Sequence, residues 1–326
     1  MCIVDLHIHL DGALSLNNIR ELANLQGVRI PSCDKKIEEK IMVSSNCRDL
    51  NEFLEKFAFP CSLLQTKEGI TRAIRNLQEE LKAQGLIYAE IRFAPQKSME
   101  RGLSQEEVVL AALEGLSQSD FMANLIVCCM RDQNNEVENM ETIRLAKKYQ
   151  KKGICAFDLA GAEGLYPTRN FKKLFDYGKK LGVPYTIHAG EAAGPESVEK
   201  AVSFGARRIG HGVRAAEDEQ LLKILAEKKI TLELCPTSNL NTGVFSDISD
   251  FPIRKLMEAG VCVTINTDDP AISGTSLRKE WELIVKTFLL NEQEQKELIK
   301  NAIRASFANE SQRARLELGT EKGFII

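Results

Sequence analysis

The chain has 326 residues, 44% of them hydrophobic, and its 43 basic and 46 acidic residues nearly cancel. This hydrophobic content is ordinary for a globular protein and sufficient for a large core. No block of like charge dominates, which argues against nucleic acid or an anionic membrane as a partner, because both require a concentrated basic face. We therefore expect a small-molecule ligand, and the sequence carries no signal for a particular oligomeric state.

The segment MCIVDLHIHLDG lacks the basic region, the long apolar stretch and the small-residue cleavage site of a secretion signal. No segment approaches the roughly 20 apolar residues that cross a bilayer. We therefore expect a cytoplasmic protein. The nine cysteines form no C-x-x-C pair and several lie in apolar runs. This pattern favours reduced core residues over disulfides or a thiolate metal site.

Short runs rich in Val, Ile and Leu alternate with longer amphipathic stretches, which is typical of a parallel sheet covered by helices. The eight expected strands are residues 3–9, 86–93, 123–129, 153–159, 183–188, 207–211, 230–235 and 261–267. The first connection, residues 13–85, is far longer than one crossover needs, so we expect extra helices there over one end of the fold.

Helical periodicity is clearest in residues 67–85, which end in Gly85, and in residues 104–118. Ser104 and Glu107 form the capping-box pattern at the start of the second helix. After the last expected strand, further helices are expected near residues 279–290 and 292–308.

Eight such βα units predict an α/β fold, namely a (β/α)8 or TIM barrel, formed by residues 1–326 as a single domain. Extra helices are expected in the first crossover and at the C-terminus. The alternative is a doubly wound open sheet. That fold typically carries G-x-G-x-x-G after its first strand, whereas the first strand here ends in His-x-His.

The chain contains only four histidines, and all of them lie at the ends of expected strands. In a barrel these ends converge on the face that carries the active site. His7 and His9 share one face of their strand because side chains alternate along a strand. Together with His188 and Asp268 they would give three nitrogens and one oxygen, a donor set that suits catalytic zinc with an open position for water. The fourth histidine, His211, would then be free to orient or deprotonate that water.

Each of these residues also has a purely structural interpretation. The His-x-His pair can be polar residues at a strand edge, His188 a hydrogen-bonded core imidazole and Asp268 a turn residue before proline. Glu191 can be a carboxylate near a helix start or, if buried, a general acid with a raised pKa. The glycines on either side of His211 allow the backbone to approach a ligand closely. Asp269 would point away from Asp268 and could bind the substrate.

Eight motifs occur in a fixed order along nearly the whole chain, and in that order they resemble the adenosine deaminase family of amidohydrolase barrels. They are HIHLDG (7–12), FLEKF (53–57), YAEIRFAP (88–95), DLAG (158–161), HAGE (188–191), IGHG (209–212), LCPTSN (234–239) and NTDDP (266–270). One departure is Ala162, which follows DLAG where relatives often carry an acidic residue.

The resemblance implies zinc-dependent hydrolytic deamination of adenosine and 2′-deoxyadenosine to inosine and deoxyinosine, with release of ammonia. One zinc ion per chain would activate the attacking water. Its implied ligands are His7, His9, His188 and Asp268. The implied catalytic residues are Glu191 as the acid that protonates purine N1, His211 as the base, and Asp269 as a partner of N7 or of the new hydroxyl.

For the substrate, the resemblance implies that the Gly161 N–H binds purine N3 and that Asp11 contacts the ribose 5′-hydroxyl. His9 is also expected to contact the substrate. Phe53 and Phe57 could line an apolar lid over the base or belong to an ordinary helix core. Adenine-specific relatives tend to carry Glu where Asp11 stands, which favours nucleosides. Adenine, AMP and modified adenosines remain the alternative substrates.

Two rival interpretations make different predictions. A binuclear amidohydrolase typically bridges its metals with a modified lysine at the end of the fourth strand, but that strand reads ICAFDLAG and contains no lysine. A catalytically inactive barrel that only binds partners would have lost at least one of the chemical residues, and none is missing. The sequence therefore favours a mononuclear enzyme.

Overall fold

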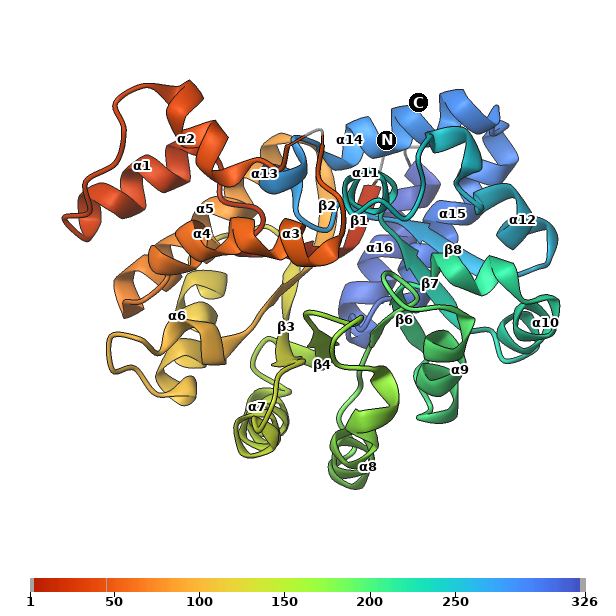
Figure 1. Cartoon of the computed structure of the whole chain (residues 1–326), viewed down its shortest axis with the longest axis horizontal. Helices are drawn as coiled ribbons and strands as arrows, with labels where there is room; N and C mark the ends of the chain where they lie inside the picture. Colours follow the sequence, from red (N-terminus) through yellow and green to blue (C-terminus); the bar gives the residue numbers. More distant parts are fainter. Residues whose placement is uncertain (1–2, 45, 323–326) are drawn as a thin grey trace.

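The computed structural model describes residues 3–44 and 46–322, in which eight parallel strands surround a common centre (Figure 1). They form two sheets with the orders β1-β2-β3-β4 and β5-β6-β7-β8. The strands are β1 (Ile3–His9), β2 (Leu86–Phe93), β3 (Ala123–Met130), β4 (Ile154–Ala160), β5 (His188–Ala189), β6 (Arg208–His211), β7 (Thr231–Leu234) and β8 (Cys262–Ile265).

Isolated bridges join the two sheets at both seams, and no continuous ladder crosses either seam within the described residues. One parallel bridge pairs Ile8 with Asp268, and the other pairs Phe157 with Tyr185. At the first seam the Asp268 N–H donates to the His7 carbonyl at 2.7 Å. The strands therefore follow one another in chain order around a ring, and the predicted TIM-barrel class is confirmed.

The fifth strand is shorter than expected. Residues 183–188 were expected to form it, but β5 contains only His188 and Ala189. The residues before it pair with β4 through the isolated bridge between Tyr185 and Phe157, in which the Phe157 N–H donates to the Pro184 carbonyl at 3.0 Å. The other seven expected strands agree with the structure to within two residues at each end.

Helices pack around the ring of strands and across its ends (Figure 1). They are α1 (Leu16–Leu25), α2 (Asp34–Ile41), α3 (Leu50–Leu54), α4 (Ala58–Ser62), α5 (Lys67–Ala83), α6 (Gln105–Ser117), α7 (Glu136–Tyr149), α8 (Lys172–Leu181), α9 (Pro195–Ser203), α10 (Glu219–Glu227), α11 (Pro236–Asn241), α12 (Ile253–Glu258), α13 (Pro270–Ser273), α14 (Leu277–Phe288), α15 (Glu292–Ala305) and α16 (Glu310–Lys322). Gly85 follows α5 with a φ of 86°, and Ser104 and Glu107 form the expected capping box of α6.

The expected extra helices are present at both places. Helices α1–α4 fill the first crossover, and α14 and α15 follow β8. The sequence did not predict α16, whose Gln312 binds Asn124 at the amino end of β3. Between α15 and α16, the Phe307 N–H donates to Glu90 at 2.6 Å, and its ring lies 4.1 Å from the Arg208 guanidinium carbon. The C-terminal segment thus closes the amino end of the barrel and leaves the carboxyl end for a site.

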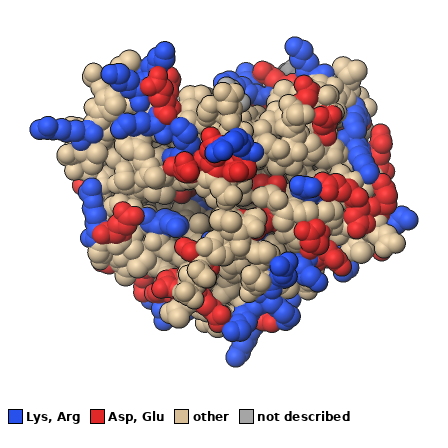
Figure 2. All heavy atoms as spheres, in the orientation of Figure 1, with Lys and Arg blue, Asp and Glu red and all other residues tan. Residues whose placement is uncertain are grey.

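One cluster of buried apolar side chains extends along the described chain from Ile3 to Leu316. None of the described helices is long and apolar enough to cross a membrane. Figure 2 shows basic and acidic side chains interspersed over the visible face. Of the nine cysteines, Cys2 lies outside the described residues, and the other eight are free thiols, with Cys33 exposed rather than in the core.

Candidate metal and catalytic site

Three histidines and one aspartate meet at the carboxyl end of the barrel. His7 and His9 come from β1, His188 from β5, and Asp268 follows β8. One ligand atom of each lies within 4.8 Å of the corresponding atoms of the other three. The four residues that the sequence predicted as metal ligands are therefore brought together.

The spacing of these atoms fits a single small cation. The Nε2 atoms of His9 and His188 are 3.2 Å apart. Asp268 Oδ1 lies 3.2 Å from His7 Nε2 and 3.4 Å from His9 Nε2. Ligands at 2.0–2.1 Å from a tetrahedral zinc ion are separated by about 3.3 Å. The donor set therefore fits zinc in both chemistry and size.

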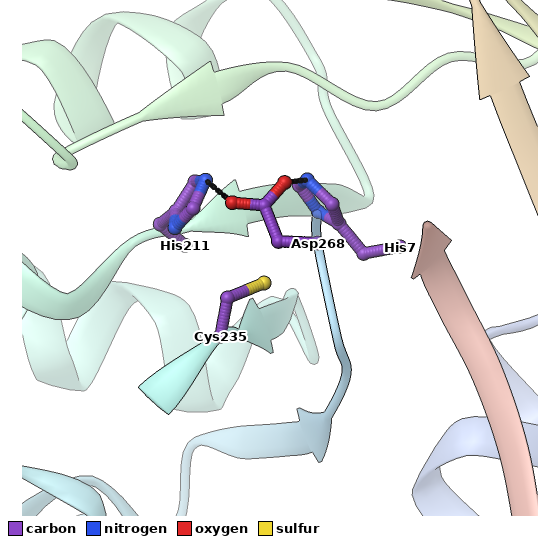
Figure 3. Close-up of side chains that lie close together, drawn as sticks. All are labelled: His7, His211, Cys235 and Asp268. Atoms are coloured by element: carbon purple, nitrogen blue, oxygen red, sulfur yellow. Dashed lines mark ion pairs between the residues drawn. The ribbon is translucent and has the colours of Figure 1, made fainter. Parts of the chain in front are cut away.

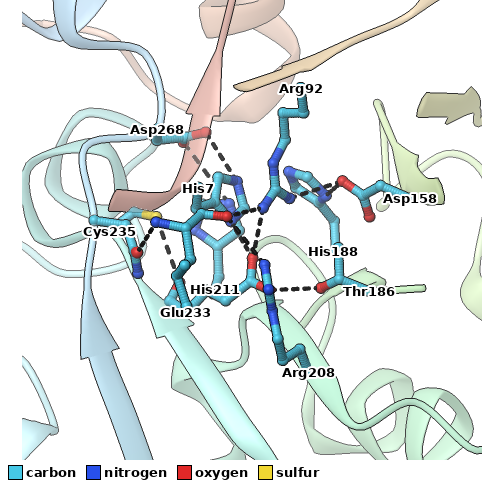
Figure 4. A network of polar contacts seen from close by, with 12 residues as sticks. His7, Arg92, Asp158, Thr186, His188, Arg208, His211, Glu233, Cys235 and Asp268 are labelled. Atoms are coloured by element: carbon cyan, nitrogen blue, oxygen red, sulfur yellow. Dashed lines mark hydrogen bonds and ion pairs between the residues drawn. The ribbon is translucent and has the colours of Figure 1, made fainter. Parts of the chain in front are cut away.

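Two carboxylates orient the imidazoles from behind (Figure 4). Glu233 lies 2.8 Å from His7 Nδ1, and Asp158 lies 2.8 Å from His188 Nδ1. With Nδ1 so engaged, each ring presents Nε2 to the centre, as metal-binding histidines commonly do. Burial opposes the ionised form of Asp158, but the charges of His188 and Arg92 outweigh it and hold the pKa of Asp158 below its ordinary value.

A buried ionic layer lies beneath the histidines. Arg92 lies 2.8 Å from both Asp158 and Glu233. Arg208 lies 2.7 Å from Glu233 and 2.5 Å from Glu90. All five side chains are at most 1% exposed. Buried charges persist only when they are paired and hydrogen-bonded. The two arginines therefore hold in place Asp158 and Glu233, the carboxylates that contact His188 and His7. Sequence reasoning did not find it.

Asp268 and His211 both have left-handed backbone conformations, with φ values of 62° and 58°. Non-glycine residues rarely adopt this region, and where they do the strain is often associated with function. Figure 3 shows Asp268 between His7 and His211, and its Oδ2 lies 3.7 Å from His211 Nε2. The turn after β8 therefore directs one carboxylate toward two histidines.

Glu191 and His211 lie side by side next to this centre. Glu191 Oε1 is 3.7 Å from His211 Nε2, and both side chains are nearly inaccessible to solvent. Burial, together with the charges of Asp268 and Glu163, raises the pKa of Glu191 well above its ordinary value. Burial lowers the pKa of His211 to about 3. The two shifts favour a protonated carboxyl beside a neutral imidazole, an acid and a base 3.7 Å apart.

Two further aspartates lie in the same region. Asp269 Oδ1 and Asp11 Oδ1 are buried and have no hydrogen-bond partner among the described residues. Gly12 makes room for Asp269, since a Cβ on Gly12 would lie 1.7 Å from Asp269 Oδ1. The Cys61 thiol donates to Asp11 Oδ2 at 3.5 Å. Unpartnered buried oxygens are costly, so these two point to a polar ligand.

The remaining predicted residues lie around this region. Gly161 follows β4 with a φ of 105°, a conformation that requires glycine. Phe53 is only 1% exposed and packs in a small apolar cluster with Ile272, three residues after Asp269. Phe57 lies at the edge of that cluster, with its ring centroid 6.1 Å from that of Phe53.

Cys235 lies close enough to His7, His211 and Asp268 to form a second, overlapping donor set (Figure 3). Burial raises the pKa of its thiol well above the ordinary value, and the S–H donates to the Glu233 carbonyl at 3.4 Å. A metal binds the thiolate, so the set of three histidines and Asp268 is favoured.

Gly210, one of the two glycines beside His211, makes room for the His7 imidazole, since a Cβ on Gly210 would lie 2.8 Å from that ring.

The comparisons with known proteins agree with this geometry. The family model for adenosine deaminase matches residues 3–321. The chain belongs to the adenosine deaminase family. The resemblance seen in the motifs is thereby confirmed. Within this family, an adenosine deaminase from Haemophilus ducreyi is 48% identical over 96% of this chain and 94% of its own length.

Two solved structures have the same fold as this chain. The adenine deaminase from Arthrobacter aurescens has a TM-score of 0.89 and is 28% identical, over 98% of each chain. The N6-methyl-AMP deaminase from Arabidopsis thaliana has a TM-score of 0.85 and is 25% identical, over 99% of this chain and 97% of its own. The adenosine deaminase family fold therefore occurs in proteins named for several 6-aminopurine substrates.

Proposed function

We propose that this protein deaminates adenosine and 2′-deoxyadenosine by hydrolysis to inosine and deoxyinosine, with release of ammonia. The observation that carries the proposal is a buried centre of three histidines and one aspartate with an acid–base pair in contact with it. Its relative from Haemophilus ducreyi is named adenosine deaminase. We also propose that the whole chain acts as a single catalytic domain.

In this proposal one zinc ion is held by His7, His9, His188 and Asp268. The metal would lower the pKa of water toward neutrality and so supply the nucleophile for C6 of the purine. The fit of the donor spacing to a tetrahedral ion supports this assignment. The side chain of His9 is 12% exposed, whereas that of His7 is fully buried, so His9 also faces the substrate side.

The proposed acid is Glu191, which donates its proton to purine N1 and makes C6 more electrophilic. His211, a neutral imidazole, accepts the proton of the attacking water. Burial and the neighbouring charge of Asp268 raise the pKa of Asp269 well above its ordinary value, which allows its carboxyl to donate to purine N7. The amino group takes the proton held by His211 and leaves C6 as ammonia, and the hydroxyl on C6 returns its proton to Glu191 and becomes the carbonyl of inosine.

The remaining contacts would select a nucleoside. We propose that the Gly161 N–H donates a hydrogen bond to purine N3. The unpartnered Oδ1 of Asp11 would accept a hydrogen bond from the ribose 5′-hydroxyl. Phe53 and Phe57 would form one wall of the lid over the base. The carboxylate of Asp11 would repel a 5′-phosphate.

Ultraviolet absorbance of adenosine, 2′-deoxyadenosine, adenine and AMP, followed in parallel with zinc-loaded protein, tests the proposal. We expect conversion of the two nucleosides only. Conversion of adenine alone, the substrate for which one structural neighbour is named, would overturn the roles given to Asp11 and the lid, and so would conversion of AMP alone. A protein that binds metal and converts none of the four substrates would overturn the deaminase assignment.

Replacing Asp158 with asparagine should weaken zinc binding by about 10–100-fold, the usual effect of losing a carboxylate behind a metal-binding histidine. The reason is that Asp158 lies 2.8 Å from His188 Nδ1 and fixes which ring nitrogen faces the metal. Competition with a coloured chelator measures the affinity, and circular dichroism checks folding. A folded Asp158→Asn protein with wild-type zinc affinity would contradict the orientation role.

A further inference from the structure

The segment that carries Glu191 is held by one buried carboxylate. Glu163 lies in the loop after β4 and is fully buried. It accepts hydrogen bonds from four consecutive backbone N–H groups of the loop between β5 and α9. These come from Gly190 at 2.9 Å, Glu191 at 3.1 Å, Ala192 at 2.8 Å and Ala193 at 2.9 Å. Both oxygens of the Glu163 carboxyl therefore act as acceptors, and each of the four N–H groups has a partner.

A chain of donors supports Glu163 from the other side. The Ser197 hydroxyl at the start of α9 donates to Glu163. Thr168 Oγ1 lies 2.7 Å from Ser197 Oγ. The Arg131 guanidinium donates to Thr168 Oγ1 at 2.9 Å and to the His188 carbonyl at 2.6 Å. Since Arg131 can only donate and both Glu163 oxygens act as acceptors, the hydroxyls between them have one consistent direction.

The two ends of this network hold the two ends of one short segment. Arg131 fixes the carbonyl of His188, a proposed metal ligand, and Glu163 fixes the backbone from Gly190 to Ala193. Gly190 has a φ of 73°, so the backbone turns sharply between the two anchors. The Glu191 carboxyl projects from this turn toward His211.

We propose that Glu163 is a positioning residue that holds the 190–193 backbone so that the Glu191 carboxyl meets the purine ring nitrogen. This inference rests on the proposed function and adds a residue to it that does not touch the substrate. Misplacing a reacting group by about 1 Å can cost about 100-fold in rate. Relaxation of this segment should therefore reduce turnover more than substrate binding. Metal binding should persist, because none of the four ligand side chains touches Glu163.

The test compares zinc-loaded Glu163→Gln and Glu163→Asp with the wild type. Glutamine keeps the length of the side chain but turns an NH2 group toward backbone donors, and aspartate is too short to reach all four N–H groups. We expect kcat for adenosine to fall by about 100-fold in Glu163→Gln, with KM changed less than threefold and one zinc per chain retained. The matched control is Glu196→Gln, because this exposed side chain accepts from the Gly194 N–H alone in the same loop.

Two further readouts separate positioning from a merely structural role. Hydrogen exchange of the 190–193 amides should accelerate in Glu163→Gln and not in Glu196→Gln. A nucleoside inhibitor that mimics the hydrated, N1-protonated purine should lose affinity in parallel with kcat/KM, while inosine binds as in the wild type.

Wild-type kcat in folded, zinc-loaded Glu163→Gln and Glu163→Asp would overturn the positioning role, even if both variants melt at lower temperature. Equal losses of affinity for the inhibitor and for inosine would also overturn it. A wild-type protein that deaminates no purine nucleoside would overturn the proposed function itself, a result visible before any variant is compared.

Discussion

Replacing Glu191 with glutamine should lower kcat for adenosine by about a thousandfold, within the range that general acid catalysis contributes. Glutamine has the same size and fits the same buried position, but its amide has no acidic proton for purine N1. Zinc should remain bound because Glu191 is not among the proposed ligands. Steady-state kinetics and metal analysis measure the two effects. The matched control is Glu199→Gln on α9, an exposed residue that should keep full activity.

The role of Glu191 as an acid also predicts how kcat changes with pH. Burial raises the pKa of Glu191, so the protonated, active form persists to higher pH than in an ordinary glutamate and is lost as the pH rises through that raised pKa. The wild-type kcat should therefore decline on the alkaline side. His211, with its pKa lowered to about 3, remains neutral over the same range. The residual activity of Glu191→Gln should show no such alkaline decline. If the decline is unchanged in this variant, the titrating group is not Glu191.

Removing the metal should abolish deamination and also lower the melting temperature. Without a cation, the buried Asp268 carboxylate and three imidazoles lose their shared partner. A ligand that binds only the folded state stabilises it by about 2.7 kcal/mol at a hundredfold excess over Kd. Calorimetry of chelated protein titrated with zinc should therefore show a melting temperature that rises with zinc concentration while activity returns.

A cysteine variant distinguishes the two overlapping donor sets. Cys235→Ser should bind one zinc per chain with wild-type affinity, because the thiol is protonated and donates to the Glu233 carbonyl. Loss of zinc in this variant would move the site to the set that contains Cys235 and His211. Unchanged activity and melting temperature after chelation would contradict a metal centre of either kind.

The sequence predicted the parts of this site that follow from local pattern. Histidines at strand ends, together with the rule that barrel strands present their carboxyl ends to one face, were sufficient to group His7, His188 and Asp268. The fifth strand was predicted too long because a local hydrophobic run does not show that its first residues pair with β4 only through an isolated bridge. Helix α16 was missed for a related reason, since its amphipathic pattern is weak and its place depends on its contact with Asn124 of β3.

The supporting residues were missed because they depend on contacts between distant segments. Glu233 and His7 are 226 positions apart, and nothing local to either indicates the other. A signal did exist in the strands themselves. Glu90 and Arg92 occur two positions apart in β2, a strand otherwise buried and largely apolar. Charges at period two in a buried strand indicate an inward ionic layer. Glu163 has no such signal, because its partners are backbone N–H groups.

The closure of the barrel by Phe307 links the tail of the chain to the metal centre. The Phe307 N–H holds Glu90, Glu90 pairs with Arg208, Arg208 pairs with Glu233, and Glu233 orients His7. Each of these groups is charged or polar and buried, so none has water to replace a lost neighbour. A chain truncated before residue 307 would lack the N–H that donates to Glu90. It would also lack the aromatic ring that packs against the Arg208 guanidinium. The C-terminal segment thus supports the candidate site from the amino end of the barrel. We expect its removal to affect the orientation of the His7 imidazole first.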